Sequence, residues 1–169
     1  GGGVIGCEFA SLYAAMGTEV TIIELMPRLL PLLEAELSKV LSLSLKKAGV
    51  KVLTGVRVQG VEEGNNGLAV TLSDGQVFST DLVLLSLGRK PDTTGLGLES
   101  MGVILTEQGR IKVDNHLRTN LPWLYAIGDV NDAPFDLAHT ASVQGMVAVE
   151  NIAGRDRKMD YHAVPNCVF

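Results

Sequence analysis

A glycine-rich turn at the start of the chain, Gly1-x-Gly3-x-x-Gly6, constrains the fold more than any other feature. A helical pattern, a β-branched run and an acidic residue, Glu24, follow it in that order. In a dinucleotide-binding turn the first glycine permits a tight bend, the second lets a diphosphate approach bare backbone, and the third lets the helix pack closely. The acid would accept hydrogen bonds from both hydroxyls of an adenosine ribose, which favours NAD over NADP.

A glycine triplet by itself is as often a flexible turn as a nucleotide site. The strand that should precede Gly1 in such a site lies outside the sequence, whereas the spaced acid Glu24 favours the dinucleotide site. Arg28 is the nearby cation that could favour NADP, although an arginine after a proline is more often simply solvated.

The periodicity of the sequence predicts an α/β fold. Three helical patterns, each followed by a glycine, predict helices at 7–16, 33–48 and 138–153. Two apolar runs, 19–24 and 82–87, predict buried parallel strands. Between them, alternating residues with turns at 65–67 and 73–75 predict an antiparallel meander. We expect short strands at 111–113 and 124–127 as well.

Charge and composition exclude several classes of function. The chain has 14 basic and 19 acidic residues and no block of like charges, so it lacks the basic surface of a nucleic-acid-binding protein. No uncharged run approaches the roughly 18 residues that a membrane helix needs, and no leader pattern is present, so we expect a cytoplasmic protein.

The cysteines and histidines of the chain have no spacing typical of a metal site or a disulfide framework. We expect Cys7 to be a buried helix residue and find no thiol near Cys167 in the sequence. His116 and His162 are interpreted as ordinary surface or turn residues.

A second motif follows the expected strand at 124–127. Gly128-Asp129 is by itself an ordinary turn, but a helix start at Leu137-Ala138-His139-Thr140 comes soon after it. Because this second motif occurs in the same chain as the glycine-rich turn, a functional interpretation of it is favoured.

Taken together, these segments resemble the flavoprotein pyridine nucleotide–disulfide oxidoreductases over the whole chain. The resemblance is carried by GGGVIGCEFASLYAAMGTEVTIIE, SLGRKPD, RTNLPWLYAIGDV, LAHTASVQGMVAVENIAG and DYHAVPNCVF. It implies a Rossmann-like parallel sheet with an antiparallel meander at 1–90, the NAD-binding domain without its first strand. Residues 91–157 would complete the FAD-binding domain, and 158–169 would begin an interface domain that forms a homodimer. We therefore expect an excerpt of a longer protein.

The resemblance also implies contacts to both cofactors, NAD and FAD. Glu24 would hold the ribose of NAD, Glu8 and Gly88 would lie on the nicotinamide side, and Asp129 would bind the ribityl chain of FAD. The helix start at 137–140 would face the pyrimidine edge of the flavin, where its positive end would stabilise the anionic reduced ring, with His139 acting mainly through its backbone. The remaining candidates form the pyrophosphate loop: Gly1, Gly3, Val4, Ile5 and Gly6.

Three positions distinguish among members of the family. Val4, Gly6 and Glu24 differ from the pattern of glutathione reductases and favour an NAD-linked member of the lipoamide type. The implied substrate is dihydrolipoamide or a lipoyl protein. The redox-active cysteine pair and the acid/base histidine of the family lie outside the sequence, so we expect no catalytic residue in these 169 residues and no turnover by them alone.

Two kinds of alternative remain open. The parent could be another flavin enzyme, such as mercuric reductase, glutathione reductase, a soluble transhydrogenase or an NADH oxidase. It could also be a non-catalytic module that senses NAD and has no flavin partner.

Overall fold

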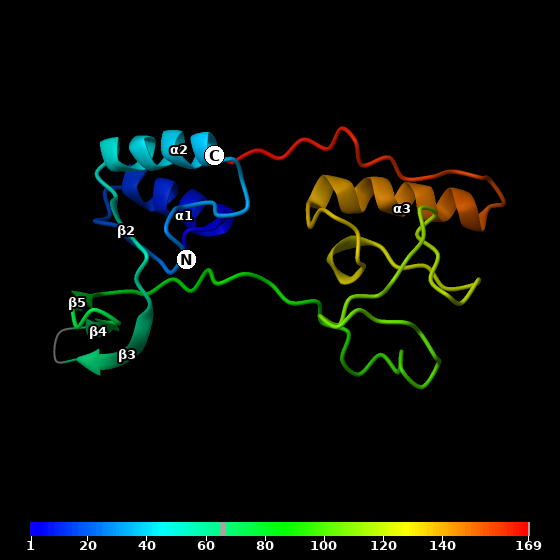
Figure 1. The fold of residues 1–169 in the computed structure, drawn as a ribbon, viewed down its shortest axis with the longest axis horizontal. Coiled ribbons are helices and arrows are strands. Elements are labelled where there is room, and N and C mark those ends of the chain that lie inside the picture. Colours follow the sequence, from blue (N-terminus) through cyan, green and yellow to red (C-terminus); the bar gives the residue numbers. More distant parts are fainter. Residues whose placement is uncertain (65–66, 169) are drawn as a thin grey trace. The chain divides into compact units, whose positions relative to one another are not determined.

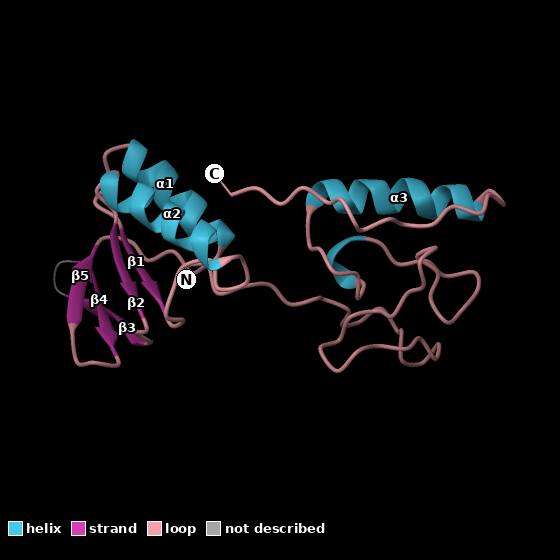
Figure 2. Cartoon of the chain, turned by 45° about the horizontal axis from the view of Figure 1, so that its top comes forward, coloured by secondary structure: helices cyan, strands magenta, loops and turns pink. Residues whose placement is uncertain are grey.

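A computed structural model describes residues 1–64 and 67–168 and divides the chain into two compact units. The first unit comprises Gly1–Gly88 plus the C-terminal residues from Cys167. The second comprises Arg89–Asn166. In Figure 1 the first unit carries the labels α1, α2 and β2 to β5, and the second carries α3; strand β1 is labelled in Figure 2.

The first half of unit 1 is a parallel β–α–β arrangement. Helix α1 (Val4–Ala15) leads into strand β1 (Thr21–Glu24), and helix α2 (Ala35–Lys47) leads into strand β2 (Lys51–Thr54). The two strands pair in parallel over their full length. Both helices lie side by side next to this pair (Figures 1 and 2). The expected mixed α/β fold is confirmed.

Local sequence explains why these helices form and end where they do. Glu36 lies in the first turn of α2, and Lys46 and Lys47 lie in its last turn, so the charges complement the helix dipole. Gly17 and Gly49 follow the two helices with φ of +89°, a conformation that ends a helix and that L-residues with a side chain avoid. The helices cover a core whose buried members are Cys7, Ala10, Ile22, Leu29, Leu30, Leu45 and Val50.

The second half of unit 1 is the expected antiparallel meander. Strands β3 (Val58–Gly64), β4 (Gly67–Leu72) and β5 (Val77–Thr80) pair in the order β3-β4-β5. The turn predicted at 73–75 is confirmed, because the Gly75 N–H donates to the Leu72 carbonyl over 3.1 Å. In the turn predicted at 65–67, residues 65 and 66 lie outside the described residues.

Residues 82–87 do not form the buried strand that the sequence predicted. Leu82 and Leu87 are 69% and 81% exposed, and no strand of the described chain pairs with this segment. A strand needs a neighbour that satisfies its backbone groups, and β1 has β2 as its only partner among the described residues. The apolar run is therefore an extended loop in this chain.

Other predicted boundaries also differ from the structure. Helix α1 begins at Val4, three residues earlier than predicted, because Gly3 already has the extended backbone of an N-cap. Strand β1 begins at Thr21 instead of residue 19. The prediction of strands at 111–113 and 124–127 is wrong. These segments make only isolated β-bridges, such as the one between Arg118 and Tyr125, which do not extend into ladders.

Unit 2 consists mainly of loops with a short 3₁₀ helix, η1 (Gly128–Val130), and the long helix α3 (Ala138–Ile152). Helix α3 matches the prediction at 138–153 to within one residue. Unit 2 has two groups of buried apolar side chains. The first consists of Leu98, Val103, Ile111 and Ala126. The second includes two residues of α3 and consists of Leu117, Val147, Ala148 and Met159.

None of the described helices is both long and apolar enough to span a membrane.

Candidate nucleotide-binding site

The N-terminal turn of α1 is open to an anion. Gly3 is the N-cap, and within the described residues no side chain caps the helix; no acidic residue lies in the first turn. The first N–H groups of an α-helix have no partner inside the helix, and the helix dipole adds positive potential at this end. A diphosphate can accept hydrogen bonds from these N–H groups, and its negative charge is stabilised by the positive potential.

The glycines of this turn differ in the space around them. A Cβ atom on Gly6 would lie 2.0 Å from the Gly1 carbonyl oxygen, so the helix start can approach the turn only without a side chain there. A Cβ atom on Gly1 would lie equally close to the Ser86 carbonyl oxygen. Around Gly3 the described chain leaves the space open, with no atom within 4 Å of an added Cβ. The turn is therefore closely packed on one side and free on the side where a ligand would approach.

Glu24 joins the end of β1 to the glycine-rich turn. Its carboxylate accepts hydrogen bonds from the N–H of Gly2 and, over 2.7 Å, from the N–H of Met26. The residue is only 9% exposed. The structure thus brings the predicted ribose acid next to the predicted phosphate turn, and each carboxylate oxygen retains a lone pair for a ligand hydroxyl.

Arg28 is more constrained than a solvated arginine. The side chain is half-buried, and its Nη2 donates to the Pro31 carbonyl over 3.0 Å. Its Nη1 is buried and has no hydrogen-bond partner within the described chain. The guanidinium is held by the loop that follows Glu24.

The other candidates in unit 1 lie around the same turn. Val4 packs against the core, Ile5 is 43% exposed, and Glu8 is half-buried on α1. The segment that leads to the exposed Gly88 touches the turn, as the closeness of Ser86 to Gly1 shows.

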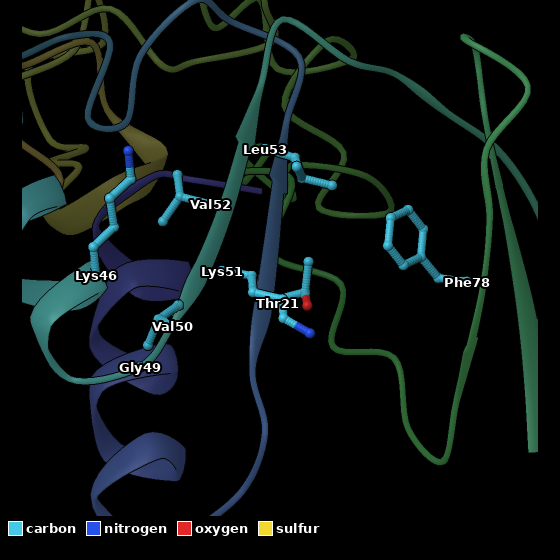
Figure 3. Close-up of a pocket in the computed structure, with 8 residues that line it drawn as sticks. All are labelled: Thr21, Lys46, Gly49, Val50, Lys51, Val52, Leu53 and Phe78. Atoms are coloured by element: carbon cyan, nitrogen blue, oxygen red, sulfur yellow. The ribbon is translucent and has the colours of Figure 1, made fainter.

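A separate pocket of about 470 Å³ lies in unit 1 between β2 and β5 (Figure 3). Leu53 and Phe78 point toward each other across it, and Lys46 and Lys51 are also among its lining residues. None of the residues predicted to bind a nucleotide lines this pocket.

The candidates for flavin binding lie in unit 2. Asp129 is in η1, and its carboxylate pairs with Arg89 over 2.7 Å. Leu137 is the N-cap of α3, with extended backbone, and no side chain in the described chain caps this helix. Thr140, in the first turn, is 3% exposed, and its hydroxyl finds no hydrogen-bond partner among the described residues. A buried hydroxyl without a partner is costly, so its lack of one suits a bound polar group.

The imidazole of His139 makes a contact away from this helix end. Its Nε2 lies 3.0 Å from the Pro165 carbonyl, while the rest of the residue is exposed. Ala138 is exposed at the first position of α3.

Two polar residues that sequence reasoning missed organise this part of unit 2. The buried Gln144 accepts from the Gly128 N–H over 2.6 Å and from Asn131, and donates to the Tyr161 hydroxyl over 3.0 Å. Arg110 makes a two-point pair with Asp136. Gln144 lies one helical turn after Thr140, which was a usable signal, whereas nothing in the sequence pointed to Arg110.

The histidines and acids do not assemble into a metal site. His116 lies 2.8 Å from Asp156, and the His162 N–H donates to Asp160. In residues 1–64 and 67–168 no three side chains of His, Cys, Asp or Glu gather closely enough to hold a metal ion.

Cys7 is the buried helix residue that the sequence predicted. It is fully buried in α1, and its thiol donates to the Gly2 carbonyl over 3.4 Å. Burial raises the pKa of the Cys7 thiol from 9.0 to about 11.

The raised pKa of Cys7 predicts slow alkylation. Because the thiolate is the reactive form, iodoacetamide at pH 8 should modify Cys7 about a hundredfold more slowly than a thiol of pKa 9. The rate should rise as the pH approaches 11, and unfolding in urea should restore the ordinary rate. Peptide mass spectrometry measures both rates. Rapid modification of Cys7 in the folded protein would contradict this assignment.

Comparisons with known proteins show which family the chain matches. The family model described as pyridine nucleotide-disulphide oxidoreductase matches residues 1–145. The dihydrolipoyl dehydrogenase of Chlamydia pneumoniae is 43% identical over 169 residues, which cover 100% of this chain and 36% of that protein.

The chain is also similar in structure to solved oxidoreductases. LpdA from Mycobacterium tuberculosis has a TM-score of 0.90 and 32% identity over 99% of this chain and 36% of its own. The water-forming NADH oxidase from Lactobacillus brevis, bound to NADH, has a TM-score of 0.84 and 28% identity over 94% of this chain and 36% of its own. The chain thus spans 36% of the length of these relatives.

Proposed function

Since the chain belongs to the pyridine nucleotide-disulphide oxidoreductases, we propose that it supplies the NAD-binding part and a portion of the FAD site of a dihydrolipoyl dehydrogenase-like enzyme. The parent would convert dihydrolipoamide and NAD⁺ to lipoamide, NADH and a proton. The single observation that carries the NAD site is the contact of the Glu24 carboxylate with the Gly2 N–H at the uncapped start of α1.

This contact supports NAD over NADP. The diphosphate would accept hydrogen bonds from the N–H groups at the start of α1, above the open face of Gly3. The ribose hydroxyls would donate to Glu24, where a 2′-phosphate would be repelled by the carboxylate. Glu8 and Gly88 would lie on the nicotinamide side of the same dinucleotide.

The residues that would hold FAD are Asp129, at the ribityl chain, and the helix start of Leu137, Ala138, His139 and Thr140, at the pyrimidine edge. When bound, FAD supplies two-electron chemistry between a disulfide and a nicotinamide. The uncapped N–H groups of α3 and the unpartnered hydroxyl of Thr140 suit the polar edge of such a ring. The role of this chain is to position both cofactors and to stabilise negative charge on the reduced ring.

The proposal extends to the organisation of the parent. Residues 1–90 would belong to the NAD-binding domain, 91–157 to the FAD-binding domain, and 158–169 to the start of the interface domain. A homodimer, a cytoplasmic location and a lipoyl-protein partner stay predictions.

The experiment that tests this function uses the full-length protein. We expect visible flavin absorbance and NADH formation from dihydrolipoamide and NAD⁺, whereas residues 1–169 alone should form no NADH. A full-length protein without flavin would contradict the proposal, and so would one that oxidises NADH but not dihydrolipoamide.

A second candidate is an NADH oxidase, which the likeness to the Lactobacillus brevis enzyme favours. The same glycine turn and helix starts would serve it, so the difference lies in the electron acceptor. Oxygen consumption that depends on NADH and needs no disulfide would identify this alternative.

A further inference from the structure

One arginine of unit 2, Arg110, holds three points of the segment that runs from η1 to the start of α3. The Nη1 of Arg110 donates to the carbonyls of Asp129 and Asn131 over 3.1 and 3.0 Å. The same guanidinium donates to both carboxylate oxygens of Asp136, over 2.8 and 2.6 Å. This two-point pairing is the strongest geometry available to an arginine and a carboxylate.

The loop held in this way joins the two elements proposed to bind FAD. It begins at Asp129 in η1 and ends at Asp136, immediately before the N-cap of α3. Arg110 therefore fixes the spacing between Asp129, which we propose binds the ribityl chain, and the start of α3. Only 25% of its side chain is exposed, so solvent screens these bonds less than it would on the open surface.

The pair also balances charge in front of α3. An unpaired Asp136 would place a negative charge next to the first turn of the helix, where the proposed flavin ring gains negative charge on reduction. The bonds to Arg110 lower the pKa of Asp136 and keep it ionised, and the guanidinium offsets its charge. The other charged groups near Arg110 are Asp132, Asp129 and, through its contact with the Asp136 carbonyl, Arg89.

We propose that Arg110 is a positioning residue for the flavin: it clamps the Asp129–Asp136 loop and offsets the charge of Asp136 at the start of α3. This inference rests on the proposed FAD site. It makes two separable predictions, because the clamp sets FAD affinity and the charge sets the reduction potential of the flavin.

The test compares four variants of the full-length holoenzyme by FAD dissociation constant and by flavin reduction potential. Arg110→Gln should weaken FAD binding about tenfold and lower the potential by about 30 mV, which is tenfold in a two-electron equilibrium. Arg110→Lys keeps the positive charge but lacks the planar guanidinium that bonds several acceptors at once. It should therefore weaken FAD binding and leave the flavin reduction potential unchanged. The double variant Arg110→Gln with Asp136→Asn should return the potential toward that of the unmodified enzyme without restoring FAD affinity.

Arg157→Gln is the matched control, because Arg157 pairs with Glu150 on α3, far along the helix from its N-terminus. It should change neither quantity. If Arg110→Gln and Arg110→Lys both bind FAD as the unmodified enzyme does and Arg110→Gln has the same potential, the inference is overturned and the proposed function stands. If Arg110→Gln does not fold, the FAD affinity of Arg110→Lys tests the clamp and the reduction potential of the double variant tests the charge. Absence of flavin from the unmodified full-length protein overturns the proposed function itself.

Discussion

Gly3→Ala is expected to leave stability nearly unchanged and to weaken NADH binding by about tenfold to a hundredfold, the cost of losing one or more hydrogen bonds to a charged ligand. The added methyl group meets no described atom within 4 Å, and the φ of Gly3 is −74°, which alanine adopts without strain. It would instead occupy the space through which the diphosphate reaches the N–H groups at the start of α1.

Gly6→Ala is the matched comparison, because it adds the same group three residues later. Its Cβ would lie 2.0 Å from the Gly1 carbonyl oxygen, so the backbone must move, at a cost of about 1–3 kcal/mol. Urea unfolding and NADH titration of both full-length variants separate the two effects. Equal losses of stability in the two variants, or unchanged NADH affinity in Gly3→Ala, would refute the distinction between an open and a packed glycine.

Glu24→Ala should produce the largest combined effect, a loss of both stability and NADH affinity. Removing the carboxylate leaves the buried N–H of Gly2 without its acceptor, at a cost of about 1–3 kcal/mol, and also removes the acceptor of the part-buried Met26 N–H. The ribose hydroxyls lose their acceptor as well, so NADH should bind at least about tenfold more weakly.

Glu19→Ala controls for the loss of a glutamate near the same strand. Glu19 is exposed and pairs with Lys51 at the surface, a kind of contact that contributes little. This variant should match the unmodified protein in unfolding and in NADH titration. An equal loss in both glutamate variants would show that the effect of Glu24 is not specific to the turn.

The sequence was sufficient for features that depend on local rules. The β-branched run before Glu24, the charges at the ends of α2 and the glycines after the helices each act within a few residues, and the elements they predicted are present. The glycine spacing anticipated that the turn would be crowded at Gly6 and open at Gly3.

The errors arose where structure depends on distant partners. The leucines at 82–87 have the pattern of a buried strand, but pairing decides whether a strand forms, and that information is not local. The partners of Arg110 and Gln144 lie 13 to 26 residues away, so their hydrogen bonds could not be inferred from spacing. The sequence predicted that Glu24 lies near the glycine-rich turn, but it did not predict the hydrogen bond from the Gly2 N–H.

We propose that the start of α1 holds the diphosphate of a dinucleotide while Glu24 holds its ribose. The most direct test is an equilibrium binding titration of the full-length protein, with NADH and with NADPH under the same conditions, which gives the dissociation constant of each nucleotide. We expect NADH to bind at least about tenfold more tightly than NADPH, because a 2′-phosphate would face the Glu24 carboxylate. Equal affinity for both, or tighter binding of NADPH, would contradict this account.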